Sequence, residues 1–112
     1  MSLLAVADVY GIEGRREELL RLLTDSERQT GARPGCLRYE FTEAISEPDH
    51  FVLVSEWRDN ASLEAHYGSA EFASFQFALN GLLARPSEMT IYSVSELSRP
   101  VESGPMDPRD AD

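Results

Sequence analysis

The chain has 112 residues and a formal net charge of −10, with 42% hydrophobic and 27% charged residues, which is typical of one folded domain rather than a disordered segment. The acidic balance, without a basic run, argues against nucleic acid as a partner, and no apolar run is long enough to span a membrane. A single cysteine cannot form an internal disulfide and no signal-peptide pattern is present, so we expect a cytoplasmic protein.

The first half of the chain predicts a strand, a helix and a hairpin. Residues 3–10, LLAVADVY, are apolar at nearly every position, as in a strand covered on both faces. Leucines at helical spacing predict a helix over 15–30, which the segment GARPG ends. Alternating apolar residues on both sides of the turn signal EPD predict a hairpin over 36–58.

The second half predicts two helices and a last strand. Either polar residue in the pair DN can cap a short helix, and Ser69 can cap a second one after a bend at Gly68. The apolar face of this second helix is expected to continue to Leu83, with the pair RP ending it. The segment EMTIYSVSEL, 88–97, has the composition of a strand.

This order of elements predicts an α+β fold, the ferredoxin-like βαββαβ antiparallel sheet with helices on one face. Both faces of the sheet carry apolar side chains, because Val52 and Val54 point opposite to Phe51 and Leu53. An exposed apolar patch of that size is unusual on a monomer, so we predict a homodimer that buries the second face. Three charged residues are expected on that face: Arg38, Glu40 and Glu56.

The domain is expected to cover residues 1–97. The remaining segment, 98–112, contains three prolines and no apolar period. This composition predicts a disordered C-terminal tail.

Three segments, PGCLRYEF, EPDHFVLVSEW and NASLEAHYGSAEFASF, resemble the antibiotic biosynthesis monooxygenase (ABM) domain family of dimeric α+β barrels, and the resemblance covers residues 3–97. It implies a ferredoxin-like protomer, a dimer made by two sheets packing face to face, and a cavity between each sheet and its own helices. Members include cofactor-free oxygenases of aromatic polyketides and quinols, haem-degrading enzymes and an isomerase of a phosphorylated signalling molecule. The resemblance therefore indicates the fold more specifically than the reaction.

The haem-degrading branch of the family has three characteristic residues that this sequence lacks. Its axial histidine is replaced by Gln76, its first-strand asparagine by Ala7 and its second tryptophan by His66. These replacements argue against haem degradation. With two histidines and neither HExxH nor CxxC, a metal site is not expected either. The resemblance to the cofactor-free oxygenases of the family implies that no cofactor is needed.

His66 is the first candidate catalytic residue. On a helix, Leu63, His66 and Tyr67 fall on one arc, so the imidazole faces inward or lines a cleft. There it could accept a proton from, or hydrogen-bond to, a phenol or quinol. The alternative is a core histidine bonded to a carbonyl group. The other histidine, His50, lies in the predicted turn and is expected to be solvated.

Trp57 is the second candidate catalytic residue. It ends the third strand on the face of Phe51 and Leu53, which suits either a core residue or one wall of an aromatic cavity with its N–H available to a substrate oxygen. Five other aromatic residues are candidates for substrate binding: Tyr39, Phe41, Tyr67, Phe72 and Phe75. Their presence around one histidine predicts a flat apolar ligand.

By this resemblance we predict a cofactor-independent monooxygenase that oxidises an electron-rich aromatic, a quinol or anthrone-like phenol, with O2. Two alternatives stay open. One is an isomerase of a small carbonyl compound, which would need cationic groups for a phosphate. The other is a non-catalytic small-molecule-binding or accessory dimer.

Overall fold

The computed structural model describes residues 2–100, 103–106 and 109. The strands and helices follow the predicted order, with both expected helices present after the hairpin. Their bounds are β1 (Ser2–Tyr10), α1 (Arg16–Gly31), β2 (Cys36–Glu43), β3 (His50–Trp57), α2 (Asn60–Tyr67), α3 (Ala70–Asn80) and β4 (Glu88–Val94).

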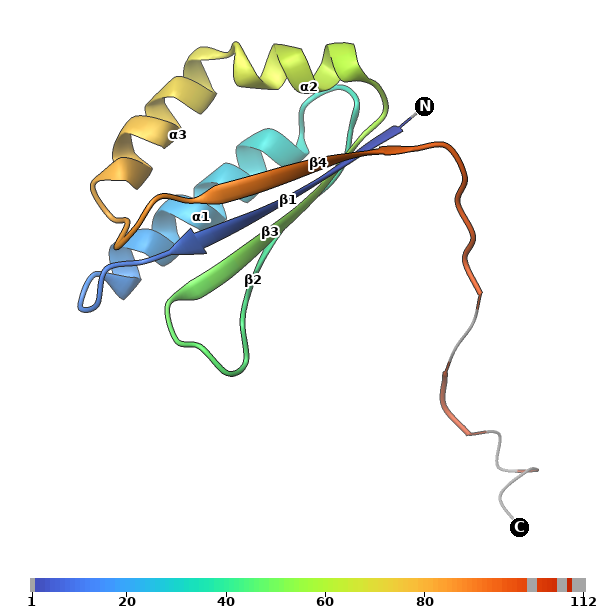
Figure 1. Ribbon diagram of the computed structural model, residues 1–112, viewed down its shortest axis with the longest axis horizontal. Helices are drawn as coiled ribbons and strands as arrows, with labels where there is room; N and C mark the ends of the chain where they lie inside the picture. The colour runs from blue at the N-terminus through green and yellow to red at the C-terminus, as the bar shows by residue number, and fades with distance from the viewer. Residues whose placement is uncertain (1, 101–102, 107–108, 110–112) are drawn as a thin grey trace.

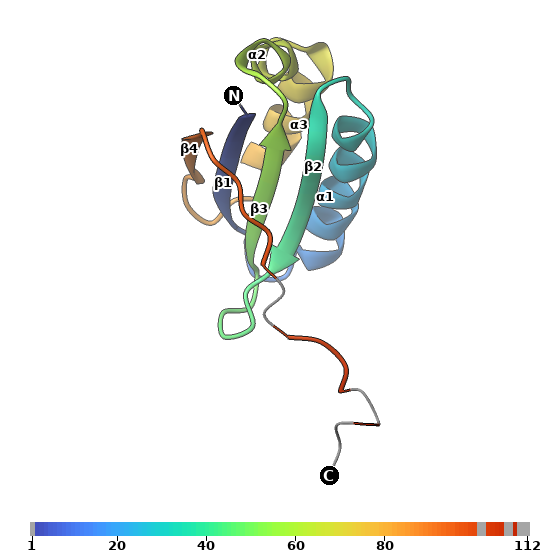
Figure 2. The same cartoon turned by 90° about the vertical axis from the view of Figure 1, so that its right-hand side faces the viewer.

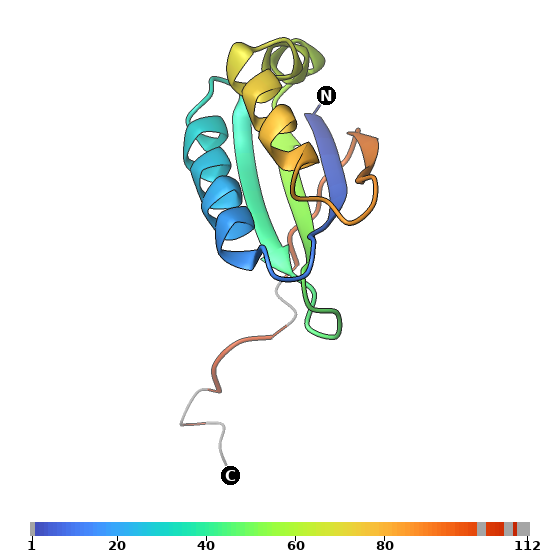
Figure 3. The same ribbon diagram turned by 90° about the vertical axis from the view of Figure 1, so that its left-hand side faces the viewer.

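The four strands form one antiparallel sheet in the order β2-β3-β1-β4, with β1 and β3 at its centre. Figure 1 shows β4 along one edge of this sheet. In Figures 2 and 3, α1 and α3 lie over the same face, and α2 lies at the end of the sheet near the N-terminus. This arrangement confirms the predicted ferredoxin-like α+β fold.

Strict alternation along β1 and β3 separates the inner face, toward the helices, from the outer face. In the register, Leu3 lies opposite Trp57 and Val9 lies opposite Phe51, and all four side chains are buried on the inner face. They belong to two core clusters, one around Trp57 and one between the sheet, α1 and α3. The inner face is therefore where the helices, the core and any cavity meet.

The outer face carries the predicted mixture of apolar and charged side chains. Val52 and Val54 are half-buried there, on the opposite side of β3 from the core residues. The guanidinium of Arg38 lies 3.4 Å from the carboxylate of Glu40 and 3.9 Å from that of Glu56. The shared face expected for these three charges is confirmed, and Arg38 pairs with both glutamates.

Local sequence signals set the start of α2 and α3. The Asp59 carboxylate accepts a hydrogen bond from the Ser62 backbone N–H at 2.8 Å, and the Ser69 hydroxyl oxygen accepts one from the Phe72 N–H at 3.1 Å. Gly35, at φ +81°, precedes β2, and a Cβ there would lie 2.0 Å from Ser62 Oγ. Only glycine therefore lets the start of β2 approach α2 this closely.

The predicted ends of α3 and β4 were wrong. Helix α3 ends at Asn80, with Gly81 as its C-cap, so Leu83 and the pair RP lie beyond it. Leu82 is still buried, in the turn that bonds back to the Leu79 carbonyl at 2.8 Å. β4 stops at Val94, which pairs with Ser2, the first residue of β1.

The prediction of a solvated His50 was also wrong. It is the first residue of β3, and its ring nitrogens lie 2.8 Å from the Asp8 carboxylate and 2.9 Å from the Glu47 carboxylate. Its ring stacks on Tyr10 with centroids 4.5 Å apart. Pairing of β1 with β3 brings Asp8 and Tyr10 to the turn, which the spacing along the chain does not reveal.

Residues 96–100 and 103–106 belong to no helix or strand. Positions 101, 102, 107, 108 and 110–112 of the expected tail lie outside the described residues, so disorder and the boundary at 97 stay predictions. Within the described part of the chain, no helix is both long and apolar enough to cross a bilayer.

Candidate active site

His66 lies at the centre of a cluster of aromatic rings. It is near the end of α2, the eight-residue helix that Asp59 caps, and is only 4% exposed. Four rings lie within 6 Å of the imidazole, measured between centroids: Phe72 at 4.8 Å, Trp57 at 5.0 Å, Tyr67 at 5.3 Å and Tyr39 at 5.9 Å. The inward orientation predicted from the helical arc is what the structure shows.

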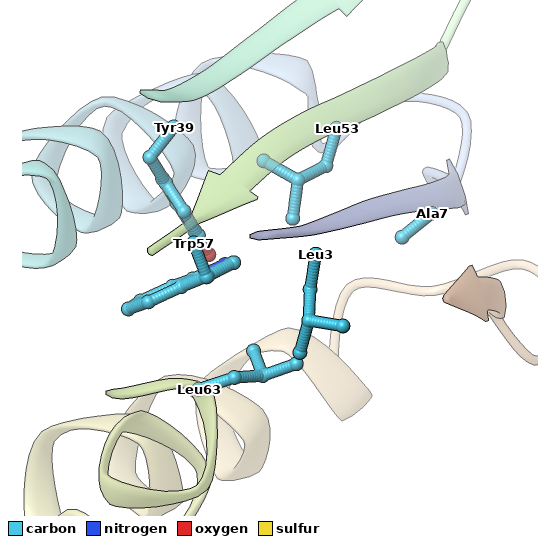
Figure 4. Packing of buried hydrophobic residues seen from close by; sticks show 6 residues of the cluster. All are labelled: Leu3, Ala7, Tyr39, Leu53, Trp57 and Leu63. Atoms are coloured by element: carbon cyan, nitrogen blue, oxygen red, sulfur yellow. The ribbon is translucent and has the colours of Figure 1, made fainter. Parts of the chain in front are cut away.

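Trp57 stacks on the imidazole at an interplanar angle of 20° and is completely buried. Figure 4 shows the indole among side chains of the core cluster, with Leu63 from α2 and Leu3 from β1 beside it. The residue is thus a core residue and a neighbour of His66 at the same time. The two interpretations of Trp57 do not exclude each other.

Two polar atoms in this cluster are buried and unpaired. Neither Nδ1 of His66 nor Nε1 of Trp57 has a hydrogen-bond partner among the described residues. Buried polar groups are normally bonded, and an unmet one costs about 1–3 kcal/mol. The core-histidine alternative needed a bonded carbonyl, and for Nδ1 none is present in the described chain. Of these two residues, only His66 lines a cavity.

The imidazole is neutral at pH 7. Burial, and secondarily the positive charge of Arg33, lower the pKa of His66 to about 4. Arg33 donates a hydrogen bond to the Ala65 carbonyl at 3.2 Å and lies 3.9 Å from the Glu71 carboxylate. A neutral imidazole has one nitrogen that accepts and one that donates, so it can receive a proton from a ligand hydroxyl.

The two tyrosines beside His66 stay protonated. Burial raises the pKa of Tyr67 to about 12, and its hydroxyl lies 2.9 Å from Sδ of Met89. Burial also raises the pKa of Tyr39, whose hydroxyl is 3.3 Å from that of Ser26 on α1. Neither phenol supplies a base, so His66 is the neutral acceptor within the ring cluster.

An inner cavity of about 90 Å³ lies between the sheet and the helices, next to His66. All five predicted substrate-binding residues line it: Tyr39, Phe41, Tyr67, Phe72 and Phe75. Trp57 does not line this cavity. It stacks on the imidazole of His66, which does line it. A cavity that holds benzene measures about 150 Å³, so the inner cavity as it stands is smaller than one aromatic ring needs.

A larger outer groove of about 430 Å³ lies between α1 and α3. Its lining comes from one face of α1, the end of α2 and the first turns of α3. Three residues, His66, Phe72 and Phe75, line both the groove and the inner cavity. The imidazole therefore belongs to both spaces.

The sequence reasoning missed the contribution of α1. Ser26 and Thr30 continue the buried stripe that begins with Leu19 and Leu23, and both are under 10% exposed. A polar pair on the apolar stripe of a helix was the available signal. Arg33 gave no such signal, because its influence on His66 arises only from packing. In the described residues, no group of three or more His, Cys, Asp and Glu side chains is arranged to hold a metal ion.

Comparison with known protein families shows which family the chain belongs to. The model of the family "Antibiotic biosynthesis monooxygenase" matches residues 2–77. The chain belongs to this family. The matched part of this ABM protein includes both candidate catalytic residues and all five cavity aromatics. The resemblance noted from the sequence is confirmed.

Individual relatives support the same assignment. The ABM chain is 32% identical over 82 residues to the uncharacterised protein sll1783 of Synechocystis, a match that covers 73% of this chain and 56% of sll1783. It is 28% identical over 82 residues to YcnE of Bacillus subtilis, provisionally named a monooxygenase, covering 73% and 86% of the two chains. The structure of Rv0793 from Mycobacterium tuberculosis, 23% identical, superposes with a TM-score of 0.81 over 88% of this chain and 100% of that one, which shows a common fold.

Proposed function

We propose that this ABM protein is a cofactor-independent monooxygenase that oxidises an electron-rich aromatic, a quinol or anthrone-like phenol, with O2. One observation carries the proposal: the neutral imidazole of His66 is enclosed by four aromatic rings, and its Nδ1 is buried without a partner among the described residues. Such a site binds a flat ring and offers one proton acceptor to its hydroxyl group.

The first step is proton transfer from the bound phenol to His66. The low pKa makes the imidazole a weak base, but a phenolate held beside it favours the protonated ring and raises that pKa. Trp57 supports the imidazole from its stacked face. The deprotonated ring is electron-rich enough to pass one electron to O2.

The second step is radical recombination. The aryloxyl radical, whose unpaired electron is delocalised onto a ring carbon that bears hydrogen, forms a C–O bond with superoxide at that carbon, and the resulting peroxide takes the proton from the imidazolium. Loss of the proton on that carbon then forms the carbonyl, while the O–O bond breaks and the distal oxygen leaves as water. One oxygen atom enters the product, the other becomes water, and the substrate supplies all four electrons. The buried ring cluster keeps bulk water away from the radicals.

A homodimer is the assembly that we propose for this enzyme. Helices cover only the inner face of the sheet (Figures 2 and 3), while Val6, Val52 and Val54 line the outer face together with the half-exposed Tyr92. A second copy that packs sheet to sheet would bury this apolar surface. Light scattering at micromolar concentration should give twice the mass of the chain, and a stable monomer would contradict the dimer.

The direct test is oxygen uptake with a panel of quinols and anthrones. We expect uptake with the wild-type protein and a loss of about 10²-fold or more in His66→Ala, the usual contribution of a positioned acid–base group. His50→Gln is the matched control, because it alters the other histidine and should keep the rate. Equal rates for wild type and His66→Ala would remove His66 from the mechanism, and no uptake with any compound would reject the monooxygenase.

A non-catalytic binding protein remains the second candidate, favoured by the small volume of the inner cavity. Thermal stabilisation by a quinol without any uptake of oxygen would support it. The isomerase alternative has less support, because Arg33, the cation that acts on His66, already pairs with Glu71.

A further inference from the structure

We propose that the two spaces divide the reactants: the outer groove between α1 and α3 binds the organic ligand, an aromatic ring with two or more hydroxyl groups, and the inner cavity holds dioxygen. This inference rests on the proposed oxygenase function and assigns a place to each reactant. His66, which lines both spaces, would stand between them.

Size separates the two spaces. The groove, at about 430 Å³, falls within the roughly 300–1,000 Å³ of small-molecule sites, whereas the inner cavity of about 90 Å³ lies well below it. A diatomic gas fits the smaller space, and a ring does not. The inner cavity has a mainly apolar lining, which includes Ala7, Val9 and Leu53, and such linings bind small apolar guests.

The chemistry of the groove fits a hydroxylated ring. Leu22, Phe72 and Phe75 give it an apolar wall for a flat ring. Polar groups that accept hydrogen bonds also line it, among them Asp25 and Glu71. Asp25 lies 2.8 Å from Arg28 and Glu71 lies 3.9 Å from Arg33, so neither carboxylate is an isolated charge. Acceptor oxygens beside an apolar wall select a ligand that carries hydroxyl donors.

The proposed proton acceptor, the imidazole of His66, is part of the groove lining. His66 is 4% exposed, its Nδ1 has no partner among the described residues, and it lines the groove beside Phe72. A ring bound in the groove would lie against one side of this imidazole. Dioxygen in the inner cavity would then meet the same ring across the shared wall of His66, Phe72 and Phe75.

Two exposed positions on α3 offer a matched pair of variants. Ser74 lines only the groove and Gln76 lines only the inner cavity, so Ser74→Trp and Gln76→Trp place the same bulky side chain on the same helix toward different spaces. The probes are naphthalene-2,7-diol, which is not readily oxidised to a quinone, and xenon. Both can be followed by NMR chemical-shift titration of the full chain, without turnover.

We expect Ser74→Trp to weaken diol binding by about tenfold or more and to keep the xenon shifts, and Gln76→Trp to do the opposite. The dimethyl ether of the diol should bind about tenfold more weakly than the diol, because it cannot donate to the acceptors of the groove. Glu71→Gln and Asp25→Asn should reduce that preference.

Loss of diol binding in Gln76→Trp but not in Ser74→Trp would place the ring in the inner cavity and overturn the inference. So would equal binding of diol and ether, no binding of the diol to the wild-type protein, or no xenon shifts at the inner cavity. Each readout is independent of oxygen uptake, so these results can fail while the monooxygenase stands, and an inactive protein can still show the division of sites.

Discussion

Each of the two histidines of this protein stacks on an aromatic ring, but the partners of their ring nitrogens differ. His66 stacks on Trp57 with centroids 5.0 Å apart, and His50 stacks on Tyr10 at 4.5 Å, both at 20°. Carboxylates contact both nitrogens of His50, and the hydrogen bond to Asp8 is the main cause of its raised pKa. His66 has no such partner among the described residues, and burial lowers its pKa to about 4.

The difference shows what distinguishes a structural histidine from a candidate site residue. Ring stacking alone does not, since both residues have it. The partners of the ring nitrogens distinguish them: His50 uses both nitrogens to connect β1, β3 and the turn between β2 and β3, whereas Nδ1 of His66 has no partner among the described residues. Four predictions can break or sharpen this comparison.

The largest effect is expected at the stacked rings. Trp57→Ala should lower the free energy of unfolding by about 3–5 kcal/mol, because it empties the centre of a fully buried cluster. Tyr10→Ala, which removes the half-buried ring beside His50, should cost less than half as much. Urea denaturation followed by circular dichroism measures both. Equal losses would mean that the two stacks are alike in energy and would break the comparison.

The next largest loss of stability is expected at Gly35, the glycine that packs against α2, the helix of His66. Gly35→Ala should destabilise the fold by about 2–4 kcal/mol, because φ is +81° and the new Cβ would meet Ser62. Gly14→Ala is the control: its φ is +87°, but the new Cβ has nothing within 4 Å, so only the backbone penalty of about 1 kcal/mol remains. A Gly35→Ala protein as stable as Gly14→Ala would show that α2 can move.

The third prediction is a pH dependence of stability due to His66. Its pKa is near 4 in the folded protein and near 6.5 when unfolded, so the unfolded chain binds more protons between these values. The contribution of His66 is fully present above pH 6.5 and should be lost as pH falls toward 4, by about 3 kcal/mol. Between pH 4 and 6.5 the urea midpoint should depend less on pH in His66→Phe than in the wild-type protein. An unchanged slope in that variant would show that other groups cause it.

The smallest effect, and opposite in sign, is expected at His50. Its raised pKa means that its contribution is present below the unfolded pKa and is lost as pH rises through the folded one. NMR titration of the imidazole Cε1 protons should place His50 above 6.5 and His66 well below. Asp8→Asn should bring the pKa of His50 back toward its ordinary value and leave that of His66 unchanged. If the pKa of His50 were the same in Asp8→Asn as in the wild-type protein, the hydrogen bond between His50 and Asp8 would not be the cause of its shift.

Much of the fold was predictable because local signals are strong in this chain. Alternating residues on β1 and β3 and the caps at Asp59 and Ser69 predicted elements that the structure contains. The end of α3 was missed because the apolar pattern continues past Gly81, where the backbone turns but Leu82 stays in the core. The spacing of apolar residues indicates which side chains are buried, and buried side chains can continue beyond the end of a helix.

The candidate site was predictable in part. The helical arc placed His66 inward, and the strand face placed Trp57 with it, since these relations depend on short spacings. The sequence could not show that Arg33 lowers the pKa of His66, that a groove runs along α1, or that the inner cavity is small. Each depends on how the helices pack on the sheet. Nor could it show that His50 would meet Asp8, 42 positions away.

The sequence by itself determined the order of the elements, which faces they bury, and that one histidine would enter the aromatic cluster, because periodicity and capping act over a few residues. Only the tertiary structure decided which histidine is paired and which is left with an unmet nitrogen. Hydrogen bonds between distant segments, and the space left between packed helices, exist only once the strands have found their register.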